Sequence, residues 1–179
     1  MSEQFDALDE TLTAFIHKQP VFFVGTAAPD GRVNVSPKGQ DSLVVTSPTE
    51  ILWQNLTGSG NETAAHLLER NRMTIMWCAF EGPPLILRVY GQARVVHPRD
   101  AKWSACAERL PTSIGSRQFY QMTIDLVQTS CGYAVPFMDY REDRVALTKW
   151  ADKRGPEGVA DYWAEKNTRS IDGKPTGIL

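Results

Sequence analysis

Apolar residues along most of this chain fall in short runs that alternate with polar positions or with turn residues. The runs are rich in β-branched and aromatic side chains and are bounded by Gly, Pro, Asp or Ser, a pattern that is typical of β-strands. It predicts six or seven strands, at 21–28, 32–36, 42–47, 50–56, 73–80, 85–96 and 121–130. The Asp30-Gly31 pair between the first two is a hairpin signal, so these strands are expected to run antiparallel.

A helical period replaces this alternation in several segments. The first is 3–18, which Pro20 terminates and in which the apolar residues share one face: Phe5, Leu8, Leu12, Phe15 and Ile16. Further helices are expected after the fourth strand and in the second half of the chain, at 62–71, 98–110, 142–152 and 156–166.

Short turns join most of the predicted strands, and only one or two helices intervene between them. This order argues against repeated β-α-β units. It predicts an antiparallel meander that closes into a small barrel with helices at its ends, a mainly β fold with some α structure. Residues 1–141 are expected to form the barrel domain, and residues 142–179 a helical extension packed on the same domain.

Composition and charge narrow the class of protein. The chain has 179 residues and a net charge of -2, with scattered basic residues, so neither a nucleic acid nor an anionic membrane is an expected partner. No apolar run approaches the roughly 20 residues that a membrane span needs. The acidic, amphipathic N-terminus is unlike a signal peptide. A cytoplasmic location is therefore predicted.

The cysteines and histidines show no metal-binding spacing. Cys78, Cys106 and Cys131 form no C-x-x-C pair and are odd in number, which argues against a disulfide scaffold and against a zinc site. The three histidines lie far apart in the sequence. No metal site is predicted.

The stretch TGSGNET, residues 57–63, lies between the strand at 50–56 and the following helix, and three interpretations compete for it. As a dinucleotide loop, Gly58-Ser59-Gly60 supplies G-x-G, but the antiparallel context argues against this reading. As a helix start, Ser59 and Glu62 form the S-x-x-E pattern of a capping box. As an anion site, the glycines let the backbone approach an oxyanion, and the first N–H groups of the helix are free to bind it.

Side-chain donors favour the anion interpretation. Ser59, Asn61 and Thr63 would supply them within the loop, while Ser36 and Lys38 lie at the end of the second strand in VNVSPKG. A cation and a hydroxyl at a strand end would complete a phosphate site. Taken alone, Lys38 more often indicates a solvated surface lysine.

The motifs SPKG, GSGNET, FEGPP and CGY occur in an order and spacing that resembles the FMN-binding split barrels related to pyridoxamine 5'-phosphate oxidase. The resemblance covers residues from about 5 to 135. It implies an antiparallel split β-barrel with FMN as its cofactor. It also implies a homodimer that binds flavin at the subunit interface and acts on a small-molecule substrate.

Carried over by position, the resemblance implies one set of cofactor-binding residues: Val35, Ser36, Pro37, Lys38, Trp53, Asn55, Ser59, Gly60, Asn61, Thr63, Cys131 and Tyr133. Those at 35–38 would lie beside the isoalloxazine ring, and those at 53 and 55 near the ring or the ribityl chain. Those at 59–63 would hold the phosphate, and the last two would approach the partner's flavin. A core position is an open alternative for Trp53 and for Cys131.

Two departures bear on the substrate. Family members that oxidise pyridoxamine phosphate carry Ser-Arg-Lys in the phosphate loop, where this chain has Ser59-Gly60-Asn61, and an Arg-rich substrate site that Arg169 alone does not reproduce. No catalytic residue is predicted, because the flavin itself carries the redox chemistry; His66 and Asp125 have structural explanations. The prediction is an FMN-dependent oxidoreductase whose substrate is not pyridoxamine phosphate. The alternative is a non-enzymatic protein that binds flavin, the deazaflavin F420 or haem.

Overall fold

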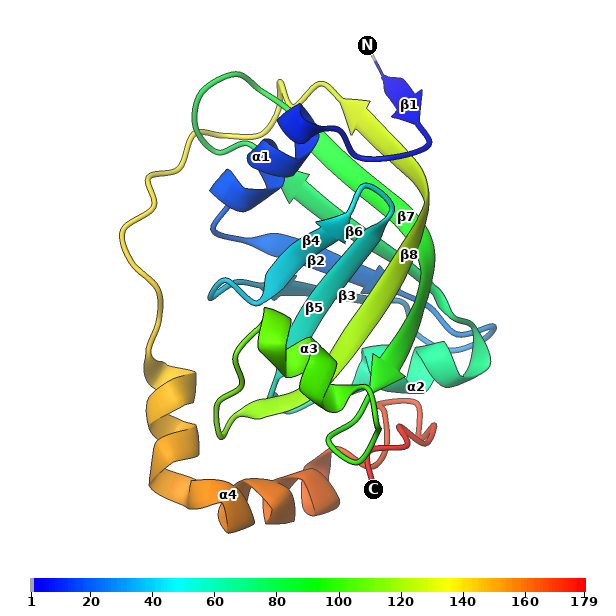
Figure 1. Cartoon of the computed structure of the whole chain (residues 1–179), viewed down its shortest axis with the longest axis vertical. Helices are drawn as coiled ribbons and strands as arrows, with labels where there is room; N and C mark the ends of the chain where they lie inside the picture. Colours follow the sequence, from blue (N-terminus) through cyan, green and yellow to red (C-terminus); the bar gives the residue numbers. More distant parts are fainter. Residues whose placement is uncertain (1) are drawn as a thin grey trace.

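One antiparallel sheet of eight strands, curled into a barrel, forms the body of the chain in the computed structural model, which describes residues 2–179 (Figure 1). The strands are β1 (Glu3–Phe5), β2 (Phe22–Thr26), β3 (Asn34–Lys38), β4 (Leu43–Ser47), β5 (Glu50–Leu56), β6 (Arg72–Cys78), β7 (Ile86–Val96) and β8 (Ser116–Ser130). The helices of this range are α1 (Glu10–Lys18), α2 (Glu62–Glu69), α3 (Trp103–Arg109) and α4 (Ala146–Lys166). The predicted mainly β fold with peripheral helices is confirmed.

Hydrogen-bonded neighbours in the sheet follow the order β3-β2-β6-β7-β8-β5-β4, and β1 pairs with β8. Every pair is antiparallel. The path ends at β3 and β4, which follow one another in the sequence, and no pairing joins these two strands in the described part of the chain. The barrel is thus open along one seam, as expected of a split barrel.

The first helix is shorter than predicted. It begins at Glu10 instead of residue 3 because Asp9 caps it, with Asp9 Oδ1 accepting a hydrogen bond of 2.7 Å from the Leu12 N–H. The residues before it form β1, which pairs with 127–129 at the end of β8. This short strand raises the count above the six or seven predicted.

β8 is longer than predicted and begins at Ser116 instead of residue 121. Its first half lies between β5 and β7. Arg117 and Gln118 interrupt the apolar pattern there, although both are buried, so the pattern misses these residues of the strand. α3 is shorter than the predicted 98–110, because turn structure occupies residues 98–102.

The C-terminal helical segment, α4, consists of two helical arms that meet at a kink, in agreement with the two helices that the pattern predicts. Gly155, with φ 68° and ψ 173°, breaks the helical geometry, and Pro156 follows it. The two arms correspond to the predicted pair, but the first begins at Ala146 instead of residue 142. Of the helices found in residues 2–179, none is both long and apolar enough to cross a membrane.

The barrel interior is apolar and closely packed. Trp53 and Tyr120 stack with their ring centroids 4.6 Å apart, and Phe22 meets Trp53 edge-on. Gly91 allows β7 to pass close to β8, since a Cβ at this position would lie 2.0 Å from the carbonyl oxygen of Thr123. Burial of the apolar side chains supplies the main driving force for this packing.

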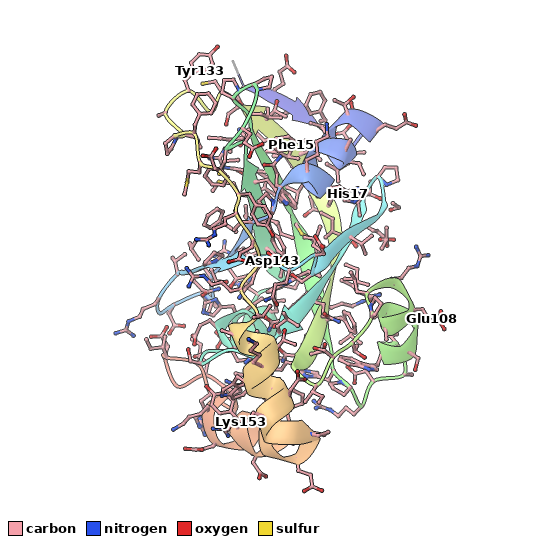
Figure 2. All side chains as sticks on the ribbon, turned by 90° about the vertical axis from the view of Figure 1, so that its left-hand side faces the viewer. Phe15, His17, Glu108, Tyr133, Asp143 and Lys153 are labelled. Atoms are coloured by element: carbon pink, nitrogen blue, oxygen red, sulfur yellow. The ribbon has the colours of Figure 1, made fainter. Side chains whose placement is uncertain are left out.

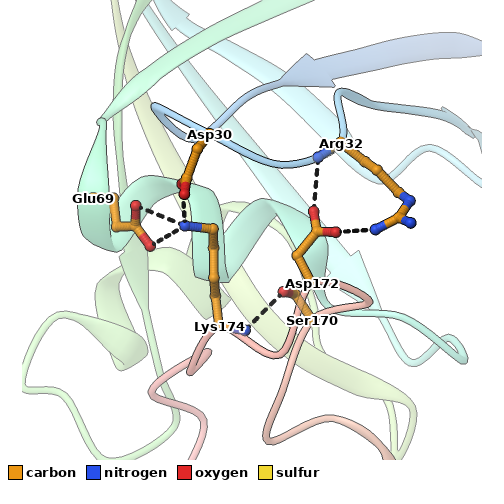
Figure 3. Close-up of polar contacts among 6 residues, drawn as sticks. All are labelled: Asp30, Arg32, Glu69, Ser170, Asp172 and Lys174. Atoms are coloured by element: carbon orange, nitrogen blue, oxygen red, sulfur yellow. Dashed lines mark hydrogen bonds and ion pairs between the residues drawn. The ribbon is translucent and has the colours of Figure 1, made fainter.

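The segment that follows α4 contacts α2 and the turn between β2 and β3 (Figure 3). Lys174 Nζ forms ion pairs with Asp30 Oδ1 at 2.6 Å and with Glu69 Oε1 at 2.8 Å. Asp172 accepts a hydrogen bond of 2.7 Å from the Arg32 N–H and also pairs with the Arg32 guanidinium. These contacts hold the end of the chain against the barrel.

Candidate functional site

A cavity of about 650 Å³ lies at the open seam of the barrel, where β3 and the end of β5 face the start of α2. Arg117 of β8 and the residues at 143, 144 and 147 complete its wall. Asp143 marks this last segment in Figure 2, above the first turns of α4. The lining includes eight of the residues that the sequence predicts: Ser36, Pro37, Lys38, Asn55, Ser59, Gly60, Asn61 and Thr63.

The other four predicted residues do not line this cavity. Val35 is exposed on the outer side of β3, because consecutive residues of a strand point to opposite faces. Trp53 is a core residue, which is the alternative considered for it. Cys131 is exposed, so the alternative of a small buried residue is wrong. Tyr133 is exposed at the end of the molecule away from α4 (Figure 2).

The glycine loop leads into α2 without the predicted capping box. The helix begins at Glu62 after Asn61, and no side-chain hydrogen bond caps it. The Glu62 carboxylate instead accepts hydrogen bonds of 3.1 Å from the Ile171 N–H in the C-terminal segment. The Ser59 hydroxyl is therefore not used as a cap. Together with the first N–H groups of α2, it can serve a ligand in the cavity.

Lys38 places a positive charge in the cavity wall. Its Nζ lies 5.5 Å from the centroid of the Trp53 ring, and no carboxylate within residues 2–179 forms an ion pair with it. Burial, reinforced by the nearby charge of Arg117, lowers the pKa of Lys38 to about 8. This residue is therefore a partly buried, unpaired cation and not a solvated surface lysine.

Arg117 is a second cation of the cavity, and sequence reasoning missed it. Its side chain is buried, and its Nη1 donates to Asn167 Oδ1 at 2.7 Å, to Gly60 O at 3.0 Å and to Gly58 O at 3.3 Å. Its Nε is buried without a hydrogen-bond partner, and no ion pair to it is formed in the described chain. Burial lowers the pKa of the guanidinium, but an arginine side chain stays charged in proteins.

A negative charge in the cavity would stabilise the two unpaired cations of its wall. Desolvation of a charge is costly, so buried charges in proteins are normally paired. The carboxylates of Glu62 and Asp143 also line the cavity but form no ion pair with Lys38 or Arg117. An anionic ligand would offset both the desolvation and the mutual repulsion of the two cations.

Uncharged polar side chains also line the cavity, and hydrogen bonds connect them to one another and to buried residues behind the wall. Asn34 Nδ2 donates to Thr63 Oγ1 at 3.3 Å, and Asn55 Nδ2 donates to Gln118 Oε1 at 3.2 Å. The Tyr120 hydroxyl donates to the same Gln118 oxygen at 3.1 Å, and Gln118 Nε2 is buried without a partner. Asn34 lines the cavity but is absent from the predicted set, because its place before SPKG carries no chemical signal of its own.

His66 and Asp125, for which the sequence analysis gives structural explanations, lie outside the cavity lining. His66 is buried, with its Nδ1 3.0 Å from Thr26 Oγ1, and it does not line the cavity. Asp125 is exposed on the outer side of β8. Neither residue is placed to act on a ligand in this cavity.

Comparison with known proteins finds relatives for most of the chain. The family model described as pyridoxamine 5'-phosphate oxidase matches residues 8–131. The pyridoxamine 5'-phosphate oxidase family protein ustO of Aspergillus flavus is 34% identical over 189 aligned positions, which span 96% of this chain and 76% of that protein.

Solved structures resemble the fold at lower sequence identity. HupZ of Group A Streptococcus has a TM-score of 0.53 and 17% identity, covering 66% of this chain and 91% of that chain. A Lactobacillus delbrueckii protein of the pyridoxamine 5'-phosphate oxidase type has a TM-score of 0.54 and 18% identity, covering 69% of this chain and 94% of that chain. At these identities the likeness concerns the fold alone.

Proposed function

Because the chain belongs to the pyridoxamine 5'-phosphate oxidase family, we propose that its cavity binds FMN and that the protein is an FMN-dependent oxidoreductase. The observation that carries the proposal is that Lys38 and Arg117 line the same cavity and that neither cation forms an ion pair with a carboxylate of the described chain. FMN combines a dianionic phosphate with a long, uncharged polar chain. Such a ligand matches a site with two cations and many neutral hydrogen-bonding groups.

The phosphate is proposed to lie at the glycine loop. The Ser59 hydroxyl, the first N–H groups of α2 and the Arg117 guanidinium would bind it, and the helix dipole favours a negative charge at this end. Asn55 would bind the ribityl chain, while the backbone at 36–38 and Lys38 would hold the polar edge of the flavin ring. The cavity volume of about 650 Å³ lies within the range of small-molecule sites, roughly 300–1,000 Å³.

The proposed site gives the cofactor and the protein separate roles. Bound FMN would supply the redox chemistry, and the chain would bind it, orient it and tune its polar edge. Lys38 is the one ionisable group proposed to face the ring, and its lowered pKa lets it hold or release a proton near pH 8. A small-molecule substrate would enter from the open seam.

We also propose a homodimer with flavin at the subunit interface. The long strand β7 is central in the sheet, and its outward side carries polar residues such as Gln92 and Arg94, so it is not the proposed dimer surface. The apolar exposure lies instead on and beside edge strand β3, at Val33 and Val35, which are 73% and 66% exposed. A second apolar group follows β8, at Tyr133, Phe137 and Met138. Edge strands with exposed apolar side chains are usually covered.

A reducing cytoplasmic location is part of the proposal. Cys78, Cys106 and Cys131 are all free thiols, and the last is exposed. We expect Cys131 to be recovered as a free thiol from cells lysed in the presence of a thiol-blocking reagent.

The absorption spectrum of the purified protein, followed by FMN titration, tests the cofactor. We expect the two visible bands of an oxidised flavin, and their loss on anaerobic addition of NADH or NADPH if the protein turns over. A Soret band would indicate haem, and bound flavin that no electron donor reduces would favour a non-enzymatic carrier. A colourless protein that binds no added FMN would contradict the proposal.

A further inference from the structure

The hydrogen-bond acceptors of Arg117 are dipoles and not carboxylates. The three acceptors of its Nη1 are the carbonyl oxygens of Gly58 and Gly60 and the amide oxygen of Asn167, all of which are neutral. Its Nε has no acceptor at all. The guanidinium is therefore held in position without being neutralised, and its full charge remains available to a ligand.

Asn167, at the end of α4, is the residue that links this cation to the loop. It is fully buried, and its Oδ1 accepts from Arg117 while its Nδ2 donates to Gly58 O at 3.0 Å and to Ser59 O at 3.3 Å. Its backbone oxygen accepts from Asn61 Nδ2 at 3.3 Å. One residue thus connects β8 and the glycine loop through its side chain, and the residue before α2 through its backbone.

The C-terminal segment holds Asn167 in this place from both sides. Upstream, the Trp163 indole donates to Thr57 Oγ1 at 2.9 Å, directly before the glycine loop. Downstream, the Thr176 hydroxyl donates to Asn167 O at 2.6 Å. The segment after residue 145 is therefore part of the site, although it lies outside the part of the chain that the family model matches, 8–131.

The chemistry of the amide explains why an asparagine suits this position. A carboxylate could not donate to the carbonyls of Gly58 and Ser59, and it would pair with Arg117 and cancel its charge. A small apolar residue would leave buried carbonyls and a buried guanidinium without partners, which is costly. Only a neutral group that both accepts and donates satisfies the loop and keeps the cation unneutralised.

We propose that Asn167 is a positioning and specificity-determining residue, which holds Arg117 as an unneutralised cation for a phosphate monoester and so makes the site prefer FMN over riboflavin. This inference rests on the proposed flavin function of the same cavity. It adds a role for the C-terminal segment, since the preference would depend on a residue from outside the barrel.

The test compares FMN and riboflavin affinities by fluorescence titration in the full chain with the substitution Asn167→Asp. We expect FMN binding to weaken roughly tenfold or more, the size of one lost charge-assisted interaction, with little change for riboflavin. Asn71→Asp is the matched control, because Asn71 is exposed and pairs with Gln92 away from the cavity. Equal losses for the two flavins, or no loss, would overturn the inference.

Arg117→Gln provides a second variant in case Asn167→Asp does not fold. It should reduce the preference for FMN at least as much as Asn167→Asp does, and in this background Asn167→Asp should change the preference no further. Thermal shift with inorganic phosphate separates the two proposals. A wild type that is stabilised by phosphate but binds no flavin, with the stabilisation lost in Asn167→Asp, would refute the flavin function and keep the role of Asn167. A wild type that responds to neither refutes both.

Discussion

The Nζ of Lys38 lies 5.5 Å from the centroid of the Trp53 ring, so a buried indole forms the floor beneath an unpaired ammonium group. The face of an aromatic ring attracts a cation, but it does not replace the water that the cation loses on burial. The pKa of Lys38 consequently lies at about 8. Two pH effects of opposite sign follow from this arrangement.

The first effect concerns the stability of the flavin-free protein. Lys38 loses its proton near pH 8 when folded and near 10.5 when unfolded, so between these values the unfolded chain binds more protons. The unfolding free energy should therefore gain a contribution that rises with pH across this window. Denaturant titrations at several pH values should show that Lys38→Met removes this rise, while Lys153→Met on exposed α4 does not. Identical pH profiles for wild type and Lys38→Met would contradict the lowered pKa.

The second effect concerns cofactor binding. Lys38 is charged below pH 8 and neutral above it, so its attraction for an anionic ligand should fade as the pH rises through about 8. FMN affinity should decrease across this window in the wild type. It should be lower at neutral pH and flatter with pH in Lys38→Met. A wild-type affinity that is constant from pH 7 to 9 would count against a charged Lys38 at the ligand.

One substitution in the glycine loop tests whether the phosphate of FMN is bound there. Ser59→Ala should weaken FMN roughly tenfold, at about 1.4 kcal/mol per decade, by removing one hydrogen bond to a charged group. Riboflavin should lose little, because it lacks the phosphate. Unchanged FMN affinity, with only a lower unfolding temperature, would indicate that the phosphate lies elsewhere.

The two glycines of this loop should respond differently to substitution. A Cβ on Gly60 would lie 3.2 Å from Glu62 Oε1, whose carboxylate is engaged by the Ile171 N–H. Gly60→Val should therefore displace the loop and weaken FMN more than Ser59→Ala does. Gly58→Ala is the matched control, since a Cβ there meets nothing within 4 Å. Equal effects at the two glycines in FMN titrations would argue against this geometry.

Sedimentation equilibrium at micromolar concentration should give twice the monomer mass of 20.0 kDa. Val35→Lys should shift the equilibrium toward monomer, because it places a charge on the exposed apolar side of edge strand β3. Ile171→Lys, an equally drastic change at an exposed position of the C-terminal segment, should leave the mass unchanged. A wild type that sediments as a monomer would refute the dimer.

Pyridoxamine 5'-phosphate should be a poor substrate. The proposed phosphate loop reads Ser59-Gly60-Asn61, and the cation beside it is Arg117 of β8. The site therefore departs from the Ser-Arg-Lys arrangement that the resemblance leads one to expect. Hydrogen peroxide release from the flavin-loaded protein is the measurement. A rate within the usual enzyme range of about 1–10³ s⁻¹ would overturn the expectation.

Local sequence patterns were sufficient to predict most strands of the barrel. β-branched and aromatic runs located seven of the strands, and Asp30-Gly31 marked the first hairpin, because alternation and turn chemistry are properties of neighbouring residues. The glycine loop could be recognised for the same reason. The pattern was wrong at residues 3–9, where pairing with β8 and the Asp9 cap decided against a helix.

The charge arrangement of the site was decided by tertiary structure alone. Arg117 and Asn167 are 50 positions apart, and neither carries a local signal, since an arginine beside an apolar run and an asparagine after a helix are common on protein surfaces. Lys38 likewise has an ordinary sequence context, and only its burial beside Arg117 lowers its pKa. Burial and charge–charge distances depend on how the chain closes on itself, so a pattern of neighbouring residues identifies the loop but not the cations that face it.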